Sequence, residues 1–209
     1  MNRESYNRIA VAWDLARVGF YGREQHYVDV LLEGLPARSA VLDLGCGTGR
    51  PIAEYVLARG HCLTGVDQAV ELLAIARSRY PQANWVESPL DEFILRDRYA
   101  AVVCWDALFH LERALHERLL EGISRSLVPG GRLMFTVGGS EHPAFTDTMF
   151  GETFFYDSHS PDRVLVLLGE LGFAPLVAEF MNAPTSGRDK GRYAIVAQRI
   201  GRQGPGSSA

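Results

Sequence analysis

The stretch Val41-Leu42-Asp43-Leu44-Gly45-Cys46-Gly47-Thr48-Gly49 decides the fold. It begins inside a short apolar run, which predicts a strand over Ala40–Leu44, and it leads into an amphipathic run that predicts a helix. Three glycines at alternate positions let the chain turn sharply and let a ligand approach the main chain closely. The free N–H groups at the start of the following helix make this turn a candidate ligand site.

Short apolar runs and longer amphipathic runs alternate along the rest of the chain, which predicts an α/β fold with a mostly parallel sheet covered on both faces. In such a sheet, ligands bind at the carboxyl ends of the strands. The predicted strands are Ala40–Leu44, Cys62–Val66, Asn84–Glu87, Ala100–Trp105, Arg132–Val137, Ala174–Phe180 and Arg192–Gln198. The predicted helices are Glu4–Arg17, Arg23–Leu32, Arg50–Arg59, Val70–Tyr80, Glu112–Leu127 and Pro161–Leu171.

Length and composition set broad limits on what the chain does. The 209 residues fit a single domain over residues 1–200, followed by a Gly/Ser-rich tail, 201–209, that we expect to be disordered. A formal net charge of −4 argues against a general nucleic-acid binder. No apolar run approaches the roughly 20 residues of a membrane span, and the N-terminus lacks the apolar core of a signal peptide. We therefore expect a cytoplasmic protein with neither nucleic acid nor membrane as a partner.

Metal and disulfide chemistry have no sequence signal. Cys46, Cys62 and Cys104 are scattered, without CxxC or Cys/His spacing typical of zinc, so we expect no metal and three free thiols.

A second polar position follows the next predicted strand. Asp67 lies 18 residues after Gly49, where a carboxylate can accept hydrogen bonds from the two hydroxyls of an adenosine ribose. The same residue can instead cap the helix that follows it, and the two roles are compatible. Dinucleotide-binding enzymes have a third glycine at G-x-G-x-x-G, but that position is Arg50 here.

Together these segments resemble a known family. DLGCGTG followed by GVDQAVELLAIAR is similar to motifs I and II of the class I S-adenosylmethionine-dependent methyltransferases, and the similarity covers most of the chain. The resemblance implies a three-layer Rossmann-like fold with a seven-stranded, mostly parallel sheet in the order 3-2-1-4-5-7-6 and an antiparallel last strand. It also implies lid helices within residues 1–35 and a substrate-side insert over residues 138–161.

The resemblance also implies which residues hold S-adenosylmethionine. The glycine turn would line the methionine moiety and the sugar, Asp43 would lie near the amino group, and Asp67 with Gln68 would bind the ribose. The adenine pocket departs from the family pattern, because Ser88 or Pro89 stands where an acidic residue is usual; Asp91 is a fallback. The predicted cofactor-binding residues are Asp43, Gly45, Cys46, Gly47, Gly49, Asp67, Gln68, Ser88, Pro89, Leu90, Trp105 and Asp106.

Substrate residues are expected in the N-terminal helices, after the fourth strand and in the insert. His110 is a candidate catalytic base because imidazole titrates near neutral pH, but it can equally order its loop. Trp105-Asp106-Ala107-Leu108 lacks the prolines found at this place in enzymes that methylate nucleic-acid amines. The predicted substrate pocket consists of Tyr6, Trp13, Tyr21, His110, His142, Phe155 and Tyr156.

The sequence therefore predicts an enzyme that transfers a methyl group to O, N or C of a small molecule by in-line displacement, as a monomer or homodimer and without a metal. Two alternatives from other classes remain at this point. One is a catalytically silent protein that binds S-adenosylmethionine or S-adenosylhomocysteine and regulates a partner. The other is a nicotinamide-dependent reductase on a similar sheet. Aminopropyl transfer from the decarboxylated cofactor is a separate, minor hypothesis.

Overall fold

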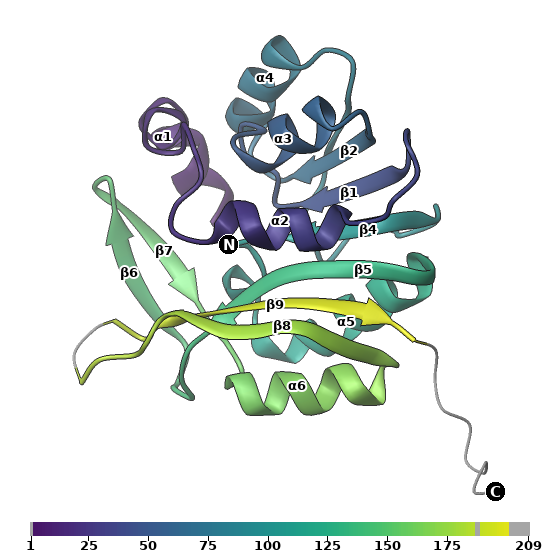
Figure 1. Ribbon diagram of the computed structural model, residues 1–209. Helices are drawn as coiled ribbons and strands as arrows, with labels where there is room; N and C mark the ends of the chain where they lie inside the picture. Colours follow the sequence, from purple (N-terminus) through teal and green to yellow (C-terminus); the bar gives the residue numbers. More distant parts are fainter. Residues whose placement is uncertain (1, 187–188, 201–209) are drawn as a thin grey trace, which may run out of the picture.

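A computed structural model describes residues 2–186 and 189–200 (Figure 1). The predicted disordered tail, 201–209, lies outside the described residues. The described part forms one seven-stranded sheet with helices on both faces and a separate two-stranded sheet at one end.

The large sheet has the predicted topology. Its order is β3-β2-β1-β4-β5-β9-β8, and β9 is antiparallel to both of its neighbours while the pairs from β3 to β5 are parallel. Omitting the two strands of the small sheet from the count, this is the order 3-2-1-4-5-7-6, so the predicted fold class is confirmed. The strands are β1 (Ala40–Leu44), β2 (Cys62–Asp67), β3 (Asn84–Glu87), β4 (Tyr99–Cys104), β5 (Leu127–Gly138), β8 (Phe173–Asn182) and β9 (Arg192–Arg199).

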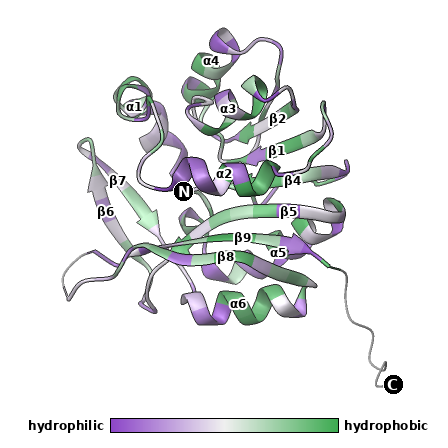
Figure 2. Ribbon diagram, in the orientation of Figure 1, coloured by the Kyte–Doolittle hydropathy of each residue, from purple (hydrophilic) through white to green (hydrophobic). Residues whose placement is uncertain are grey.

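Side chains of the central strands alternate between two hydrophobic cores. Leu42 and Val102 belong to the core under α5 and α6, whereas Val41 and Val103 belong to the core under α2, α3 and α4. This two-sided burial explains why these strands read as continuous apolar runs, and hydrophobic residues predominate along them in Figure 2. The helices are α1 (Arg3–Ala16), α2 (Glu24–Leu32), α3 (Ile52–Ala58), α4 (Val70–Arg79), α5 (Arg113–Ser126) and α6 (Pro161–Glu170), with a short 3-10 helix, η1 (Leu108–His110).

The insert differs from expectation because it contains a hairpin. β6 (Phe145–Met149) and β7 (Glu152–Tyr156) form the two-stranded sheet, which lies beside α1 (Figure 1). Ser5 Oγ donates to the carbonyl oxygen of Thr153 at 2.7 Å, and Arg8 pairs with Glu152 at 2.8 Å. The first helix and the insert, which are far apart in sequence, therefore form one wall.

Two boundaries also differ. The helix after the glycine turn begins at Ile52 rather than Arg50. β5 begins at Leu127, five residues before the predicted strand, and includes Pro129-Gly130-Gly131, which lies between the predicted helix and the predicted strand. A register shift between Tyr99 and Ala101 on β4 accommodates that segment in the ladder.

Across residues 2–186 and 189–200, no helix combines the length and apolar character needed to cross a membrane.

Candidate functional site

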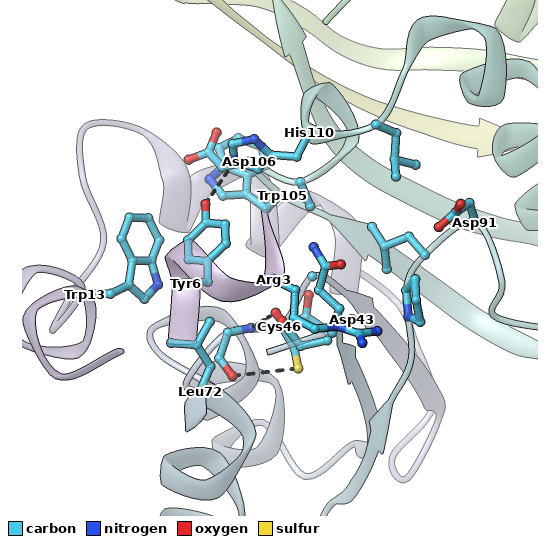
Figure 3. A pocket seen from close by; sticks show the side chains of 18 of the residues that line it. Arg3, Tyr6, Trp13, Asp43, Cys46, Leu72, Asp91, Trp105, Asp106 and His110 are labelled. Carbon is cyan, nitrogen blue, oxygen red and sulfur yellow. Dashed lines mark hydrogen bonds between the residues drawn. The ribbon is translucent and has the colours of Figure 1, made fainter. Parts of the chain in front are cut away.

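One cavity opens at the carboxyl ends of the parallel strands. Its volume is about 560 Å³, within the roughly 300–1,000 Å³ range typical of small-molecule sites. Side chains reach it from the ends of β1, β2 and β4, from the loop after β3 and from α1. Figure 3 shows Asp43 and Cys46 at one end and Trp105, Asp106 and His110 at the other. The cavity therefore has two chemically different ends.

The glycine turn is held tightly against the end of β2. The N–H groups of Gly45 and Cys46 both donate to the carbonyl oxygen of Val66, at 2.8 and 3.1 Å. Gly45 has a φ of +77°, and a Cβ there would lie 2.4 Å from the Cβ of Ala107. Only glycine fits both constraints, so the turn brings bare main chain to the cavity wall.

Asp67 fixes the next part of the turn. One carboxylate oxygen accepts from the N–H of Gly47 and the other from the N–H of Ala69, each at 2.9 Å. The second bond reaches Ala69, which is itself the N-cap residue of α4, and no side-chain bond caps that helix. Asp67 therefore fixes the approach to α4 but is not its N-cap, contrary to the capping interpretation. Burial raises the pKa of this carboxyl, while the backbone N–H donors act in the opposite direction.

Asp43 lies at the end of β1 and lines the same end of the cavity. Burial, reinforced by the negative charge of Asp67, raises the pKa of the Asp43 carboxyl to about 7. A buried carboxylate beside a second one is a strong site for a cationic group, because such a group relieves both penalties.

The loop after β3 covers part of the cavity differently from the prediction. Pro89 and Leu90 line it, but Ser88 does not, and the Ser88 hydroxyl donates to the carbonyl oxygen of Pro89 at 3.0 Å. Asp91 belongs to a turn in which Phe93 N–H donates to the carbonyl oxygen of Pro89, and it also reaches the cavity. A polar group at this side of the cavity is therefore available from Asp91 rather than from the Ser88 hydroxyl.

Trp105 and Asp106 follow β4 and belong to a charged network that the sequence does not predict. Glu24 is fully buried, receives a hydrogen bond from Trp105 Nε1 at 3.2 Å, and accepts two from Arg17 at 3.1 and 3.2 Å. Arg192 lies 3.5 Å from Glu24 and 3.2 Å from Asp106. The network ties the N-terminal helices to β9 beneath the cavity, and nothing in the spacing of these residues indicates that they meet.

Asp106 adopts a left-handed backbone conformation with a φ of +49°, and its N–H donates to Thr136 Oγ1 at 2.8 Å. Burial raises the pKa of its carboxyl, against the opposing charge of Arg192.

His110 lies at the end of η1, half-buried, with both ring nitrogens engaged. Nε2 is 2.9 Å from the hydroxyl of Tyr6, and Nδ1 is 2.9 Å from the carbonyl oxygen of Phe155 and 2.8 Å from Nδ2 of Asn2. Burial lowers the pKa of the imidazole to about 4. The ring therefore orders the loop through its contacts with Tyr6, Asn2 and Phe155.

The predicted substrate residues divide into two groups. Tyr6, Trp13 and His110 line the cavity, whereas Tyr21, His142, Phe155 and Tyr156 are not among its lining residues. Tyr21 lies beyond the end of α1, exposed, with its hydroxyl bonded to the carbonyl of Ala16.

The three insert residues face other partners. Alternation along β7 buries Phe154, so Phe155 contributes only its main chain, to Asn2 and His110. Tyr156 stacks on Phe145 and also packs against the ring of the lining residue His110, with 4.9 Å between ring centroids. His142 Nδ1 lies 2.9 Å from the carbonyl oxygen of Pro143.

Most predicted cofactor residues line the cavity, with Ser88 and Gly49 as exceptions. Gly49 has a φ of +81°, and a Cβ there would lie 3.1 Å from the rings of Trp85 and Tyr80. Gly49 therefore sets the conformation of the turn and does not form part of the cavity wall. Within the described residues, no group of three or more His, Cys, Asp or Glu side chains could hold a metal ion. The lining residues from the prediction are Asp43, Gly45, Cys46, Gly47, Asp67, Gln68, Pro89, Leu90, Trp105 and Asp106.

Comparisons with known proteins agree with this architecture. A family model described as a methyltransferase domain matches residues 41–131. The chain is 33% identical over 147 residues to the malonyl-[acyl-carrier protein] O-methyltransferase of Pectobacterium atrosepticum, covering 65% of this chain and 55% of that protein. A solved structure of DhpI in complex with SAH superposes with a TM-score of 0.72 at 20% identity and covers 95% of each chain. The chain thus matches a methyltransferase domain over residues 41–131 and shares the fold of solved S-adenosylmethionine-dependent methyltransferases.

A further structure of this fold contains both a cofactor product and a substrate. The 1,6-didemethyltoxoflavin-N1-methyltransferase of Burkholderia thailandensis, solved with 1,6-didemethyltoxoflavin and S-adenosylhomocysteine, has a TM-score of 0.65 at 21% identity and covers 95% of this chain and 91% of that one. The chain spans about half the length of the curated relatives it matches. The methyltransferase-domain match over residues 41–131 argues against the nicotinamide-dependent alternative.

The pKa of Asp43 gives a prediction for stability. A carboxyl whose pKa rises on folding costs stability above its unfolded pKa of about 3.8, and the cost grows until pH reaches about 7. Asp43→Asn removes this cost, so unfolding at pH 8 becomes less favourable by up to about 4 kcal/mol. The gain shrinks as pH falls toward 4. Urea unfolding across pH 4.5–8 measures it; an equal effect of Asp43→Asn at every pH would contradict the raised pKa.

The charged network gives a second prediction. Glu24→Gln leaves Arg17 and Arg192 beside a neutral amide in a buried place, and we expect a loss of about 3 kcal/mol in unfolding free energy. Glu170→Gln is the matched control, because its pair with Arg163 is exposed and 3.9 Å long, and we expect a change below about 0.5 kcal/mol. Equal denaturation midpoints for the two variants would refute the role of the network.

Proposed function

We propose that the cavity binds S-adenosylmethionine and that the protein transfers its methyl group to a small-molecule acceptor. The observation that carries the proposal is the bare main chain at Gly45–Gly47 beside two buried carboxylates, Asp43 and Asp67, at the carboxyl edge of the sheet. The printed names of the relatives support a small-molecule acceptor, since they include a dTDP-3-amino-3,6-dideoxy-α-D-glucopyranose N,N-dimethyltransferase and a 1,6-didemethyltoxoflavin-N1-methyltransferase.

The residues present fit this cofactor. Gly45 and Gly47 keep side chains out of the wall where the ligand would lie against the main chain, and a Cβ on Gly47 would already lie 3.4 Å from Trp13 Nε1. Asp43 would accept from the cofactor's ammonium group, which offsets the cost of burying the carboxylate. Asp67 would accept from the ribose hydroxyls with lone pairs that Gly47 and Ala69 leave free.

The sulfonium supplies an already activated methyl group, so the protein's task is to align an acceptor and exclude water. Trp13 and Tyr6 of α1 close the cavity above the glycine turn, and their ring faces can attract a cation. Trp105 and Asp106 define the opposite end, where the acceptor would lie (Figure 3).

Removal of the Asp67 carboxylate tests the cofactor site. We expect Asp67→Ala to weaken S-adenosylhomocysteine binding by about 1–3 kcal/mol, because ribose hydroxyls lose their acceptor in a buried place. Isothermal titration calorimetry at 25 °C measures the change. Asp29→Ala is the matched control, since Asp29 accepts from Tyr55 and Arg59 away from the cavity. Unchanged affinity in Asp67→Ala would remove Asp67 from the site.

A direct test separates the enzyme from a silent binder. Incubation with S-adenosylmethionine labelled in its methyl group and a small-molecule mixture should move label into a product other than S-adenosylhomocysteine. Binding of S-adenosylhomocysteine without any labelled product would instead favour the regulatory alternative.

A further inference from the structure

A hydrogen-bonded pair from two distant segments faces the acceptor end of the cavity. Tyr6 lies on α1 and His110 ends η1, and the Tyr6 hydroxyl is 2.9 Å from Nε2 of His110. Both residues line the cavity. Figure 3 shows this bond near Asp106 and Trp105, at the end away from Asp43 and Cys46.

The neighbours of the imidazole assign its proton. Nδ1 has two neighbours with opposite demands, because the carbonyl oxygen of Phe155 at 2.9 Å can only accept and Nδ2 of Asn2 at 2.8 Å can only donate. A proton on Nδ1 satisfies the Phe155 oxygen, and Asn2 Nδ2 then donates to that oxygen at 3.0 Å rather than to the ring, while Asn2 Oδ1 accepts from the N–H of Phe155 at 2.9 Å. In this tautomer, Nε2 is the acceptor for the Tyr6 hydroxyl proton. The Tyr6 oxygen keeps lone pairs for a donor inside the cavity.

The protonation states of the two side chains favour proton movement from Tyr6 to His110. Burial lowers the pKa of His110 to about 4, so its imidazole is neutral at pH 7 and free to accept a proton. Burial, with smaller contributions from Tyr156, Asp67 and Asp106, raises the pKa of Tyr6 well above its usual value, so its hydroxyl stays protonated. A proton that leaves an acceptor would thus meet the protonated hydroxyl of Tyr6, whose own proton is hydrogen-bonded to the unprotonated Nε2 of His110.

Resting on the proposed function, we propose that Tyr6 is a catalytic residue that takes the proton of a hydroxyl acceptor while passing its own proton to His110, so that the methyl acceptor is a hydroxyl oxygen. As the oxygen–methyl bond forms and the sulfur–methyl bond breaks, the acceptor proton moves to the Tyr6 oxygen and the Tyr6 proton to Nε2. The products are a methyl ether, the neutral thioether and an imidazolium, so the positive charge passes from sulfur to His110.

The chemistry of the base distinguishes oxygen from nitrogen acceptors. An alkyl ammonium group has a pKa near 10, as the lysine side chain shows, about six units above that of the buried imidazole, and would keep its proton. A hydroxyl oxygen that is gaining a methyl group becomes far more acidic and releases its proton even to a weak base. A carboxylate needs no base at all.

The chemical class of the product tests the proposal. The protein is incubated with S-adenosylmethionine carrying a ¹³C-labelled methyl group and a defined pool of phenols, alcohols, carboxylic acids, amines and thiols. Proton–carbon correlation spectra separate methyl ethers from methyl esters and from methyl groups on nitrogen, sulfur or carbon. We expect methyl ethers. Transfer only to another atom, or only to carboxylates, overturns the relay and leaves the proposed function standing, whereas no transfer at all overturns both.

Two matched variants assign the step to Tyr6. Tyr6→Phe keeps the ring that packs edge-on against Trp13 and Phe154 but removes the hydroxyl. We expect kcat for the ether product to fall by about 10²-fold or more, with S-adenosylhomocysteine affinity within about twofold of the unaltered protein. Tyr55→Phe removes a hydroxyl bonded to Asp29 outside the cavity and should leave kcat unchanged. Equal kcat in Tyr6→Phe and the unaltered protein refutes the proposal.

An NMR measurement without cofactor tests the same hydrogen bond between Tyr6 and His110. Nitrogen NMR of protein labelled at histidine, with His110→Gln to assign the signals, should show His110 protonated at Nδ1 and unprotonated at Nε2. The Nε2 signal should shift in Tyr6→Phe and stay in place in Tyr55→Phe. A ring protonated at Nε2 would overturn the proposed direction of proton transfer.

Discussion

The site depends on the connection between the glycine turn and the end of β2. Gly45 and Cys46 donate to the carbonyl oxygen of Val66, and the Asp67 carboxylate joins Gly47 to Ala69 at the start of α4. Four backbone N–H groups at the turn and the helix start are thereby satisfied by two consecutive residues of one strand. Without these bonds the turn would not be held beside Asp43 on β1 and Asp67 on β2, and this end of the cavity would not form.

The opposite end of the cavity is built by long-range contacts of the N-terminal segment. Asn2 and Tyr6 contact His110, while Arg17 at the end of α1 pairs with buried Glu24. The hairpin in the insert supplies main-chain groups here, through Thr153 and Phe155, and ring contacts from Phe154 to Tyr6 and from Tyr156 to His110. The shape of this end of the cavity therefore depends on the position of the first helix, because the same side chains that line the cavity hold the helix in place.

The predictions from sequence were confirmed where a single strand or turn determines the local structure. The apolar run at Ala40–Leu44 and the glycines after it specify a strand and a turn by local sterics, and their place in the sheet is as expected. They were wrong where tertiary contacts override local preference. Pro129-Gly130-Gly131 lies within β5 because the extra residues of β5 bulge out between the pairs Tyr99–Leu127 and Ala101–Arg132. The Ser88 hydroxyl turns to its neighbour Pro89, and the aromatic residue Tyr21 faces solvent beyond α1.

The sequence by itself determined the fold class, the glycine turn and the two carboxylates at the strand ends, since each depends on residue type and spacing along one or two adjacent elements. Only the tertiary structure decided that Arg17, Glu24 and Arg192 meet, and that both nitrogens of His110 are engaged. The physical reason is that these contacts join residues of different segments, 104 positions apart for Tyr6 and His110, and such contacts leave no periodic signal in the chain.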